Sequence, residues 1–336
     1  MGASSMIAVI SGRVLVTGSA GHLGEALVRV LRAEGHEVIG ADVLESPFTT
    51  AVGSIADRGF VRECLADVGV VLHTAALHKP HVGSHGRQAF VDTNITGTLN
   101  LLEESVTNGV GGFVFTSTTS SFGRALTPGP GEPAAWITEQ VVPAPRNVYG
   151  VTKTAAEDLC ELIHRDHGLP VVILRTSRFF PEADDRDEIR TAFSDANVKA
   201  NEYLYRRADI QDVADAHLRA MVRASAIGFG KYIVSATTPF TPDDLAALRA
   251  DAPGVVARLF PDQVAEYARR GWTMFPHIDR VYVNARARQE LGWTPRYDFR
   301  YVLDLLKAGK DPRSPLARTI GAKGYHEVST GPYTVR

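Results

Sequence analysis

The chain of 336 residues has 44% hydrophobic and 22% charged residues with a formal net charge of −2, the composition of a globular protein. This balance excludes the strongly basic domain typical of nucleic-acid binders, and no apolar run reaches the ~18 residues of a membrane span. We therefore expect neither nucleic acid nor a membrane as a partner. Two cysteines far apart in sequence, Cys64 and Cys160, favour free thiols and a cytoplasmic location over a disulfide framework.

Short apolar runs alternate with amphipathic stretches along the first half of the chain. The runs that predict buried strands are residues 14–16, 37–41, 70–73, 113–116 and 171–174. The stretches that predict helices are residues 25–33, 60–65, 94–108 and 149–167. Because strands alternate with helices, we predict an α/β fold of the Rossmann type, a doubly wound parallel sheet with helices on both faces. Ligands of such folds bind at the carboxyl ends of the strands.

The pattern changes after Pro181. The segment 182–190 is charged, and no clear alternation resumes until a strand expected at 232–235. Helical pieces follow at 243–249 and 264–270, interrupted by proline and glycine. We predict one lobe that contains the sheet, residues 12–181 plus 207–238, and a smaller, mainly C-terminal lobe, residues 182–206 plus 239–322.

A glycine-rich turn at residues 17–24 follows the first strand and opens the first helix. Free amides and the helix dipole at such a turn stabilise a pyrophosphate. Asp42 ends the second strand, where a carboxylate accepts hydrogen bonds from the ribose hydroxyls of an adenosine and repels a 2′-phosphate. These features predict NAD as the cofactor of the sheet lobe. The contacts expected in this half are Gly18, Gly21, His22, Leu23, Gly24, Asp42, Ser54, Ile55, Thr74, Ala75 and Ala76.

Tyr149 and Lys153 stand four residues apart, on one face of a predicted helix. A free tyrosine has a pKa near ~10 and is a poor base at neutral pH. A neighbouring ammonium and a positively charged nicotinamide would both favour the phenolate and lower that pKa. The pair could then take a proton from a substrate hydroxyl while a hydride leaves the same carbon. An ordinary exposed Tyr–Lys pair is the alternative for these two residues alone.

In combination, these features resemble the extended short-chain dehydrogenases/reductases, the family of NAD-dependent epimerases and dehydratases. The resemblance spans about residues 14–301. The segments that carry it, in the order of the family, are 17–24, Asp42, 73–76, 94–102, 115–123, Tyr149 with Lys153, and 290–295.

The resemblance implies a role for each residue of a catalytic site. Thr118 would bind the reacting oxygen, Tyr149 would be the acid/base, and Lys153 would lower its pKa and hold the nicotinamide ribose. The residues alone do not choose Thr118 over Thr116, Ser117 or Ser120. The resemblance adds further cofactor contacts, which are Asn94, Thr116, Tyr149, Lys153 and Ser177. The expected substrate contacts are His78, Thr118, Ser120 and Arg178.

The substrate end departs from the family. Dehydratases of the family carry an Asp-Glu pair after the catalytic Ser/Thr, whereas this chain has Thr119 and Ser120, so we do not expect dehydration. Epimerisation and net oxidation or reduction both stay open. Arg178 replaces an Asn that helps to hold the nucleotide diphosphate in the family, and the turn 179–182 looks somewhat like that of uronate dehydrogenases.

We therefore predict a sugar-like, anionic substrate, either a nucleotide sugar or a sugar acid. Arg178, with Arg186 or Arg190, could clamp its carboxylate. Arg186 and Arg190 could equally belong to a solvated loop, and the acidic run 182–185 is expected to be a solvated turn.

The loop 78–87 is cationic and holds three histidines, but no cysteine or carboxylate joins them, so no metal is predicted. The resemblance also implies a homodimer that pairs through the helices near Asn94 and Tyr149. The alternative function is a regulatory protein that binds NAD without turnover. Such proteins typically lose the Tyr or the Lys, and both are present here.

Overall fold

The computed structural model describes residues 12–324, and its main feature is a seven-stranded parallel sheet with the strand order β3-β2-β1-β4-β5-β7-β8. The strands are β1 (Arg13–Thr17), β2 (Val38–Asp42), β3 (Ala51–Val52), β4 (Val68–His73), β5 (Gly112–Thr118), β7 (Val171–Thr176) and β8 (Phe229–Val234). The central strands are continuous runs of buried apolar residues because helices cover both faces. The predicted doubly wound fold is confirmed.

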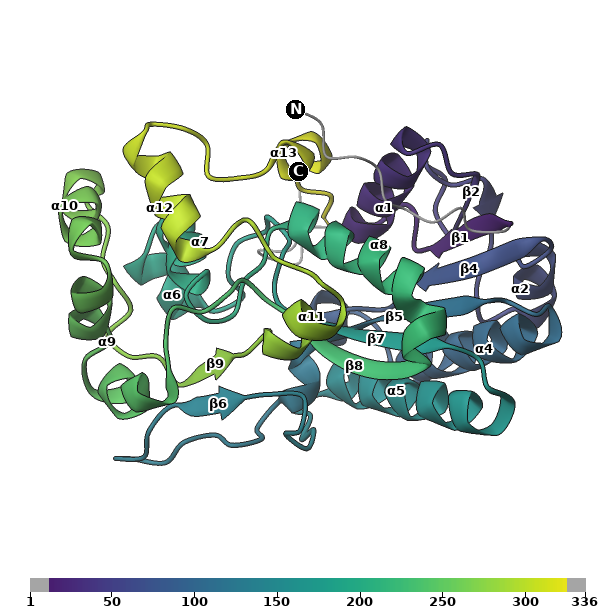
Figure 1. Cartoon of the computed structure of the whole chain (residues 1–336), viewed down its shortest axis with the longest axis horizontal. Helices are drawn as coiled ribbons and strands as arrows, with labels where there is room; N and C mark the ends of the chain where they lie inside the picture. Colours follow the sequence, from purple (N-terminus) through teal and green to yellow (C-terminus); the bar gives the residue numbers. More distant parts are fainter. Residues whose placement is uncertain (1–11, 325–336) are drawn as a thin grey trace.

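Alternate side chains of the strands enter two separate cores. Val14, Val16 and their neighbours pack against α1 (His22–Ala33) and α8 (Ile210–Ile227), whereas Leu15 and Val71 face the opposite side. Figure 1 shows α1 and α8 along one side of the sheet and α4 and α5 along the other. The helices of this second side are α2 (Arg58–Cys64), α4 (Gly97–Thr107) and α5 (Val148–His167).

A third core lies beyond the carboxyl ends of the strands, in the region that we predicted as the smaller lobe (Figure 1). It holds aromatic residues such as Phe260, Tyr267 and Phe299. The elements of this region are α6 (Asp187–Ala192), α7 (Asp195–Glu202), α9 (Leu245–Leu259), α10 (Pro261–Arg270), α12 (Phe299–Lys307) and a parallel pair of strands, β6 (Ala135–Ile137) and β9 (Arg280–Tyr282). Strand β6 falls inside the range 12–181 that we assigned to the sheet lobe, yet it pairs with a strand of the smaller lobe.

Short elements complete the described chain. They are the helical turns η1 (Lys79–Gly83), η2 (Val91–Thr96), η3 (Thr119–Phe122) and η4 (Pro242–Asp244), with α3 (Arg87–Phe90), α11 (Ala285–Glu290) and α13 (Pro315–Ile320). The helix predicted from residue 94 thus starts as the π-helical turn η2 before α4. None of the described helices combines the length and the apolar character that crossing a bilayer requires.

Helix α8 lies in a region where the sequence pattern predicted no clear helix. Its buried face is wide, because it packs on the sheet and also contacts α1 and α13, so its apolar residues do not form a narrow stripe. Its end signals are present in the sequence. The Asp209 carboxylate caps the first turn by accepting from the Gln211 amide, and Gly228 follows the last residue.

Candidate active site

A cleft of about 1340 Å³ lies at the carboxyl ends of the strands, where the strand order reverses between β1 and β4. This is where open α/β sheets bind ligands. Every expected cofactor, catalytic and substrate contact lines this cleft except Asn94 and the two further candidates, Arg186 and Arg190. The Asn94 amide accepts a hydrogen bond from the Leu77 amide at 2.8 Å and donates to the Leu77 carbonyl and the Thr152 hydroxyl at 3.0 Å. Asn94 therefore holds the wall of the cleft in place.

The glycine-rich turn leaves no room for side chains. Gly18 has φ of +73°, and a Cβ on it would lie 2.8 Å from the Ala75 nitrogen. A Cβ on Gly24 would lie 1.9 Å from the Gly18 carbonyl oxygen, so only glycine lets α1 start this close to the turn. The Asp42 carboxylate accepts a hydrogen bond from the Ala20 amide at 2.9 Å. The end of β2 and the turn are thereby held together in one wall.

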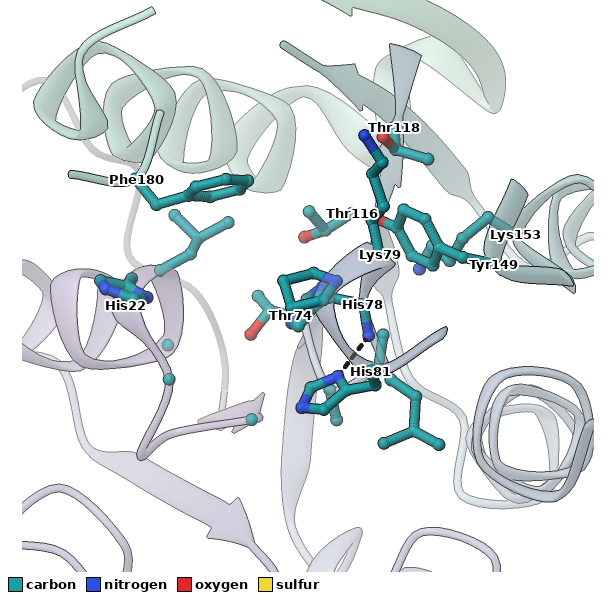
Figure 2. A pocket seen from close by; sticks show the side chains of 18 of the residues that line it. His22, Thr74, His78, Lys79, His81, Thr116, Thr118, Tyr149, Lys153 and Phe180 are labelled. Carbon is teal, nitrogen blue, oxygen red and sulfur yellow. Dashed lines mark hydrogen bonds between the residues drawn. The ribbon is translucent and has the colours of Figure 1, made fainter. Parts of the chain in front are cut away.

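Tyr149 lies in the first turn of α5, directly after a capped helix start. The Asn147 side chain accepts a hydrogen bond from the Gly150 amide at 3.0 Å and so fixes where the helix begins. Thr118, at the end of β5, hydrogen-bonds the phenol of Tyr149. In Figure 2, Thr118, Tyr149 and Lys153 lie on one side of the cleft, with His22 and Phe180 across from them.

The structure distinguishes Thr118 from its hydroxyl-bearing neighbours. The Thr116 hydroxyl donates to His217 Nε2 at 2.8 Å, because His217 Nδ1 is occupied as a donor to a carbonyl. The Ser117 hydroxyl donates to Glu157 at 2.5 Å, away from Tyr149. Thr118 alone of these three bonds the phenol, which supports the role that the family resemblance implies.

Burial governs the electrostatics of the Tyr149–Lys153 pair. Burial raises the pKa of Tyr149 to about 12, against the opposing effect of the Thr118 hydrogen bond. Burial also lowers the pKa of Lys153 from its ordinary value of 10.5 to about 7, although Cys160 and Glu157 oppose this. Lys153 Nζ lies 3.9 Å from the centre of the Phe115 ring. In the protein alone, burial dominates both pKa values, and Lys153 is not among the groups that lower the pKa of Tyr149. The expectation that Lys153 and a bound nicotinamide together lower it stays a prediction.

Arg178 lines the cleft but is not a free cation. Its guanidinium donates to Asp184 at 2.7 Å and to Asp185 and Glu202 at 3.3 Å. These contacts correct the prediction that Arg178 clamps a substrate carboxylate, because three carboxylates of the chain already hold it. Arg186 and Arg190 also reach Asp184 and do not line the cleft.

The acidic run 182–185 was predicted to be a solvated turn, and this is wrong. Glu182 and Asp184 are buried, with 6% and 4% of their surface exposed. A Glu182 oxygen lies 3.0 Å from His22 Nε2, and although burial opposes it, the contact with His22 lowers the pKa of Glu182. The run thus contacts His22 at the start of α1 through Glu182 and Arg178 through Asp184.

Several residues that line the cleft were not predicted from the sequence. Val43 and Leu44 are exposed apolar side chains directly after Asp42. Their position next to the predicted ribose contact could have marked them as cleft residues. Arg206, Arg280 and Lys323 come from the second half of the chain, where no local motif marked them. Lys323 pairs with Glu25 of α1, and its amide donates to Glu182 at 3.3 Å.

The three histidines of the loop 78–87 pack against each other rather than around a metal position. The His78 amide donates to His81 Nδ1 at 2.8 Å (Figure 2), and the His81 and His85 rings contact edge to face. Within residues 12–324, no three His, Cys, Asp or Glu side chains are grouped to hold a metal ion. The His78 ring lies edge-on to Tyr149, with 6.1 Å between the ring centres, which places it beside the phenol that Thr118 hydrogen-bonds.

Comparison with known proteins identifies the family. The model of the NAD dependent epimerase/dehydratase family matches residues 14–234. The chain belongs to this family. It is 30% identical to a dTDP-glucose 4,6-dehydratase of Streptomyces antibioticus, over 85% of this chain and 88% of that protein. It is 26% identical to a UDP-glucose 4-epimerase of Rhizobium meliloti strain 1021, over 86% of this chain and 94% of that protein.

A solved structure with the same fold contains the cofactor. A short-chain dehydrogenase/reductase superfamily protein from Agrobacterium tumefaciens with bound NAD aligns with a TM-score of 0.64 at 22% identity, over 92% of this chain and 96% of that one. The family and the fold agree with the predictions, and the protein is an NAD-dependent enzyme of the epimerase/dehydratase family.

Proposed function

We propose that the cleft binds NAD with its pyrophosphate over the turn 17–24 and its adenosine beside Asp42, Ser54 and Ile55. The crowded backbone at Gly18 and Gly24 supports this, since a pyrophosphate needs close approach to main-chain amides. The apolar side chains of Val43 and Leu44, 64% and 63% exposed, offer a surface for an adenine ring.

A buried hydroxyl supports the nicotinamide end. Ser177 is 2% exposed and lines the cleft, and its oxygen has no hydrogen-bond partner in the described part of the chain. A buried polar atom without a partner is costly, and a ligand amide or hydroxyl would satisfy it. Ser177 and the turn 17–24 line the same cleft, so together they support a dinucleotide that reaches from one to the other.

The catalytic residues in this proposal are Thr118, Tyr149 and Lys153. When bound, NAD supplies the site that accepts or returns a hydride. Thr118 hydrogen-bonds and positions the substrate oxygen, and Tyr149 gives or takes the proton of that oxygen. With a pKa of about 12 the phenol holds its proton at neutral pH. Positive charge on Lys153 and on an oxidised nicotinamide would lower this pKa and let Tyr149 act as a base.

The substrate is proposed to be sugar-like and anionic, with hydride and proton exchanged at a hydroxyl-bearing carbon. The arginines of the cleft lining support an anion; they include Arg146, Arg280 and Arg206, of which Arg206 is already paired with Asp184 and Glu202. Two of these arginines come from the smaller lobe, 182–206 plus 239–322, which we propose as the substrate-binding lobe beside an NAD-binding lobe of 12–181 plus 207–238. With Thr119 and Ser120 in place of an acidic pair, epimerisation or net oxidation is favoured over dehydration.

The observation that carries the proposal is the Thr118–Tyr149 hydrogen bond within the cleft that holds the glycine-rich turn. The experiment assays uronates, aldoses and UDP- and GDP-sugars for NADH formation and for epimer products. Tyr149→Phe should lose turnover while its Kd for NAD is unchanged, and Tyr301→Phe, outside the cleft, should behave like the wild type. Full activity of Tyr149→Phe would overturn the catalytic assignment.

The competing function is a regulatory protein that binds NAD without turnover. It would be favoured if the wild type bound NAD tightly but formed neither NADH nor an epimer with any member of the panel. The buried Tyr149–Lys153 pair argues for catalysis, because keeping an ammonium 2% exposed costs stability that a binding protein does not need.

We also propose that the protein is a cytoplasmic homodimer. Val151 and Leu162 are exposed apolar residues, 52% and 37%, and their spacing places them on one outer face of α5. Cys64 and Cys160 are buried free thiols, as expected in a reducing compartment. Light scattering should show a dimer that Val151→Glu with Leu162→Glu dissociates; a monomeric wild type would contradict it.

A further inference from the structure

The arginines that line the cleft fall into two classes. The four are Arg146, Arg178, Arg206 and Arg280. Arg178 and Arg206 share two buried carboxylates, those of Asp184 and Glu202, and are neutralised by them. These two arginines therefore form ion pairs within the protein and join the segment around Asp184 to Glu202 of α7.

Arg146 and Arg280 contact neutral oxygens. Arg146 Nη2 donates to the Thr127 hydroxyl at 3.1 Å, and Arg280 Nη2 lies 3.5 Å from the Ala125 carbonyl. Within residues 12–324, no carboxylate forms a salt bridge with either guanidinium. Ala125 and Thr127 are two residues apart in the chain, so the two guanidinium groups reach the same short segment, which follows the cleft residue Gly123.

This pair lies on the Tyr149 side of the cleft. Arg146 precedes Tyr149 by three residues, immediately before the start of α5, whose amino-terminal end adds positive potential. Arg280 and Tyr282 are alternate residues of β9, so their side chains leave the strand on the same face, and both line the cleft. Arg146 thus stands near the residue that is proposed to exchange the proton, and Arg280 lines the same cleft.

We propose that Arg146 and Arg280 form the binding site for an oxyanion of the substrate, either a carboxylate on the sugar or a phosphate attached to it. Neither guanidinium is paired with a carboxylate in the described residues, and an anion with two or more oxygens would give both of them charge-assisted hydrogen bonds. The cleft volume of about 1340 Å³ exceeds that of a usual single-ligand pocket and leaves room for a second ligand beside a dinucleotide.

This inference rests on the proposed function, and it moves the anion site from Arg178 to a pair of residues that the sequence analysis did not select. Arg146 and Arg280 would then determine the preference for anionic over neutral ligands. A neutral sugar makes no use of the pair, so losing either arginine should affect anionic ligands and leave neutral ones unchanged.

The test measures equilibrium binding of D-glucuronate, UDP-glucose and D-glucose to the NAD-saturated protein. Arg146→Gln and Arg280→Gln should each raise the Kd of an anionic probe by about tenfold or more, as expected for losing charge-assisted hydrogen bonds. Arg288→Gln, an exposed arginine of α11 outside the cleft, is the matched control and should change nothing. The Kd for NAD should be unchanged in all three variants.

The two sources of the anion give different patterns. Weakening of D-glucuronate alone identifies a ring carboxylate, and weakening of UDP-glucose alone, or of both probes, identifies a site that takes the phosphate. The inference is overturned if the wild type binds neither anionic probe, or if both variants bind them as Arg288→Gln does. The proposed function is tested separately, by turnover of Tyr149→Phe. An active Tyr149→Phe enzyme would refute the catalytic assignment, whereas the Kd values of the arginine variants would still decide where the anion binds.

Discussion

The buried Lys153 is expected to destabilise the folded protein at neutral pH. The free energy that it costs follows from its pKa. Burial lowers this pKa from 10.5 to about 7. Between these two values the unfolded chain holds a proton that the folded chain has released. The free energy of unfolding therefore rises with pH across this window, by ~1.4 kcal/mol per unit. The span of ~3.5 units corresponds to ~5 kcal/mol of destabilisation at and below pH 7.

Lys153→Met removes the ionisable group and keeps a long apolar side chain in the buried position. The variant should be more stable than the wild type by up to ~5 kcal/mol at pH 7 and by ~2 kcal/mol at pH 9. The contact of the ammonium with the Phe115 ring offsets part of this gain. The same variant should lose turnover, because the cation that favours the phenolate is gone.

The assay is urea unfolding followed by tryptophan fluorescence at pH 7, 8 and 9 without added nucleotide, since bound NAD would add stability of its own. Lys310→Met, at an exposed position, is the control and should show no such pH-dependent gain. The pH series stops at 9 so that Tyr149 does not titrate within it. Burial raises the pKa of Tyr149 to about 12, so the unfolded chain loses this proton first and the free energy of unfolding falls as the pH rises above ~10. The reasoning would be refuted if Lys153→Met were no more stable than the wild type at pH 7. It would also be refuted if the difference in free energy of unfolding between the two proteins did not decrease from pH 7 to pH 9.

Three further substitutions test the site and its support. Glu157→Gln leaves the buried Arg175 guanidinium uncompensated and should lower the free energy of unfolding by ~3–5 kcal/mol in urea titrations; a smaller loss than ~1 kcal/mol would contradict the pairing. Thr118→Val should reduce turnover by ~10²-fold or more with the Kd for NAD unchanged, as steady-state kinetics and calorimetry would show, and wild-type turnover would exclude its role. Asp42→Ala should raise the Kd for NAD by about tenfold in a fluorescence titration, because it removes a ribose acceptor and the anchor of Ala20; an unchanged Kd would place the adenosine elsewhere.

The parts of the fold that the sequence predicts well are those with local causes. The strands of the sheet are runs of Val, Ile and Leu that can only be buried on both sides. The turn at Gly18 needs a positive φ, and the close packing at Gly24 needs a residue without a Cβ, so glycine spacing there reports geometry directly. The position of Tyr149 follows from its capped helix, which Asn147 starts. Each of these signals lies within a few residues of the structure that it predicts.

The properties that the sequence does not predict arise only when distant segments meet. The pKa of Tyr149 depends on how completely the folded chain buries it, and no spacing of Tyr149 and Lys153 contains that information. Glu182 was read as solvated because its neighbours are charged, but its partner His22 lies 160 residues earlier in the chain. Similarly, α8 lacks a narrow apolar stripe because neighbours from elsewhere in the chain surround it.

The arginines show why charge in a sequence is weak evidence for ligand binding. Arg178 stands in a motif position and attracted a functional prediction, yet Asp184 and Glu202 neutralise it in the folded chain. Arg146 and Arg280 belong to no motif, and what marks them is that the fold brings them to the cleft without bringing a carboxylate. A cation that the protein leaves uncompensated beside Tyr149 gains most from an anionic ligand, because no internal pair has to be broken first. Substrate charge should therefore be sought at Arg146 and Arg280.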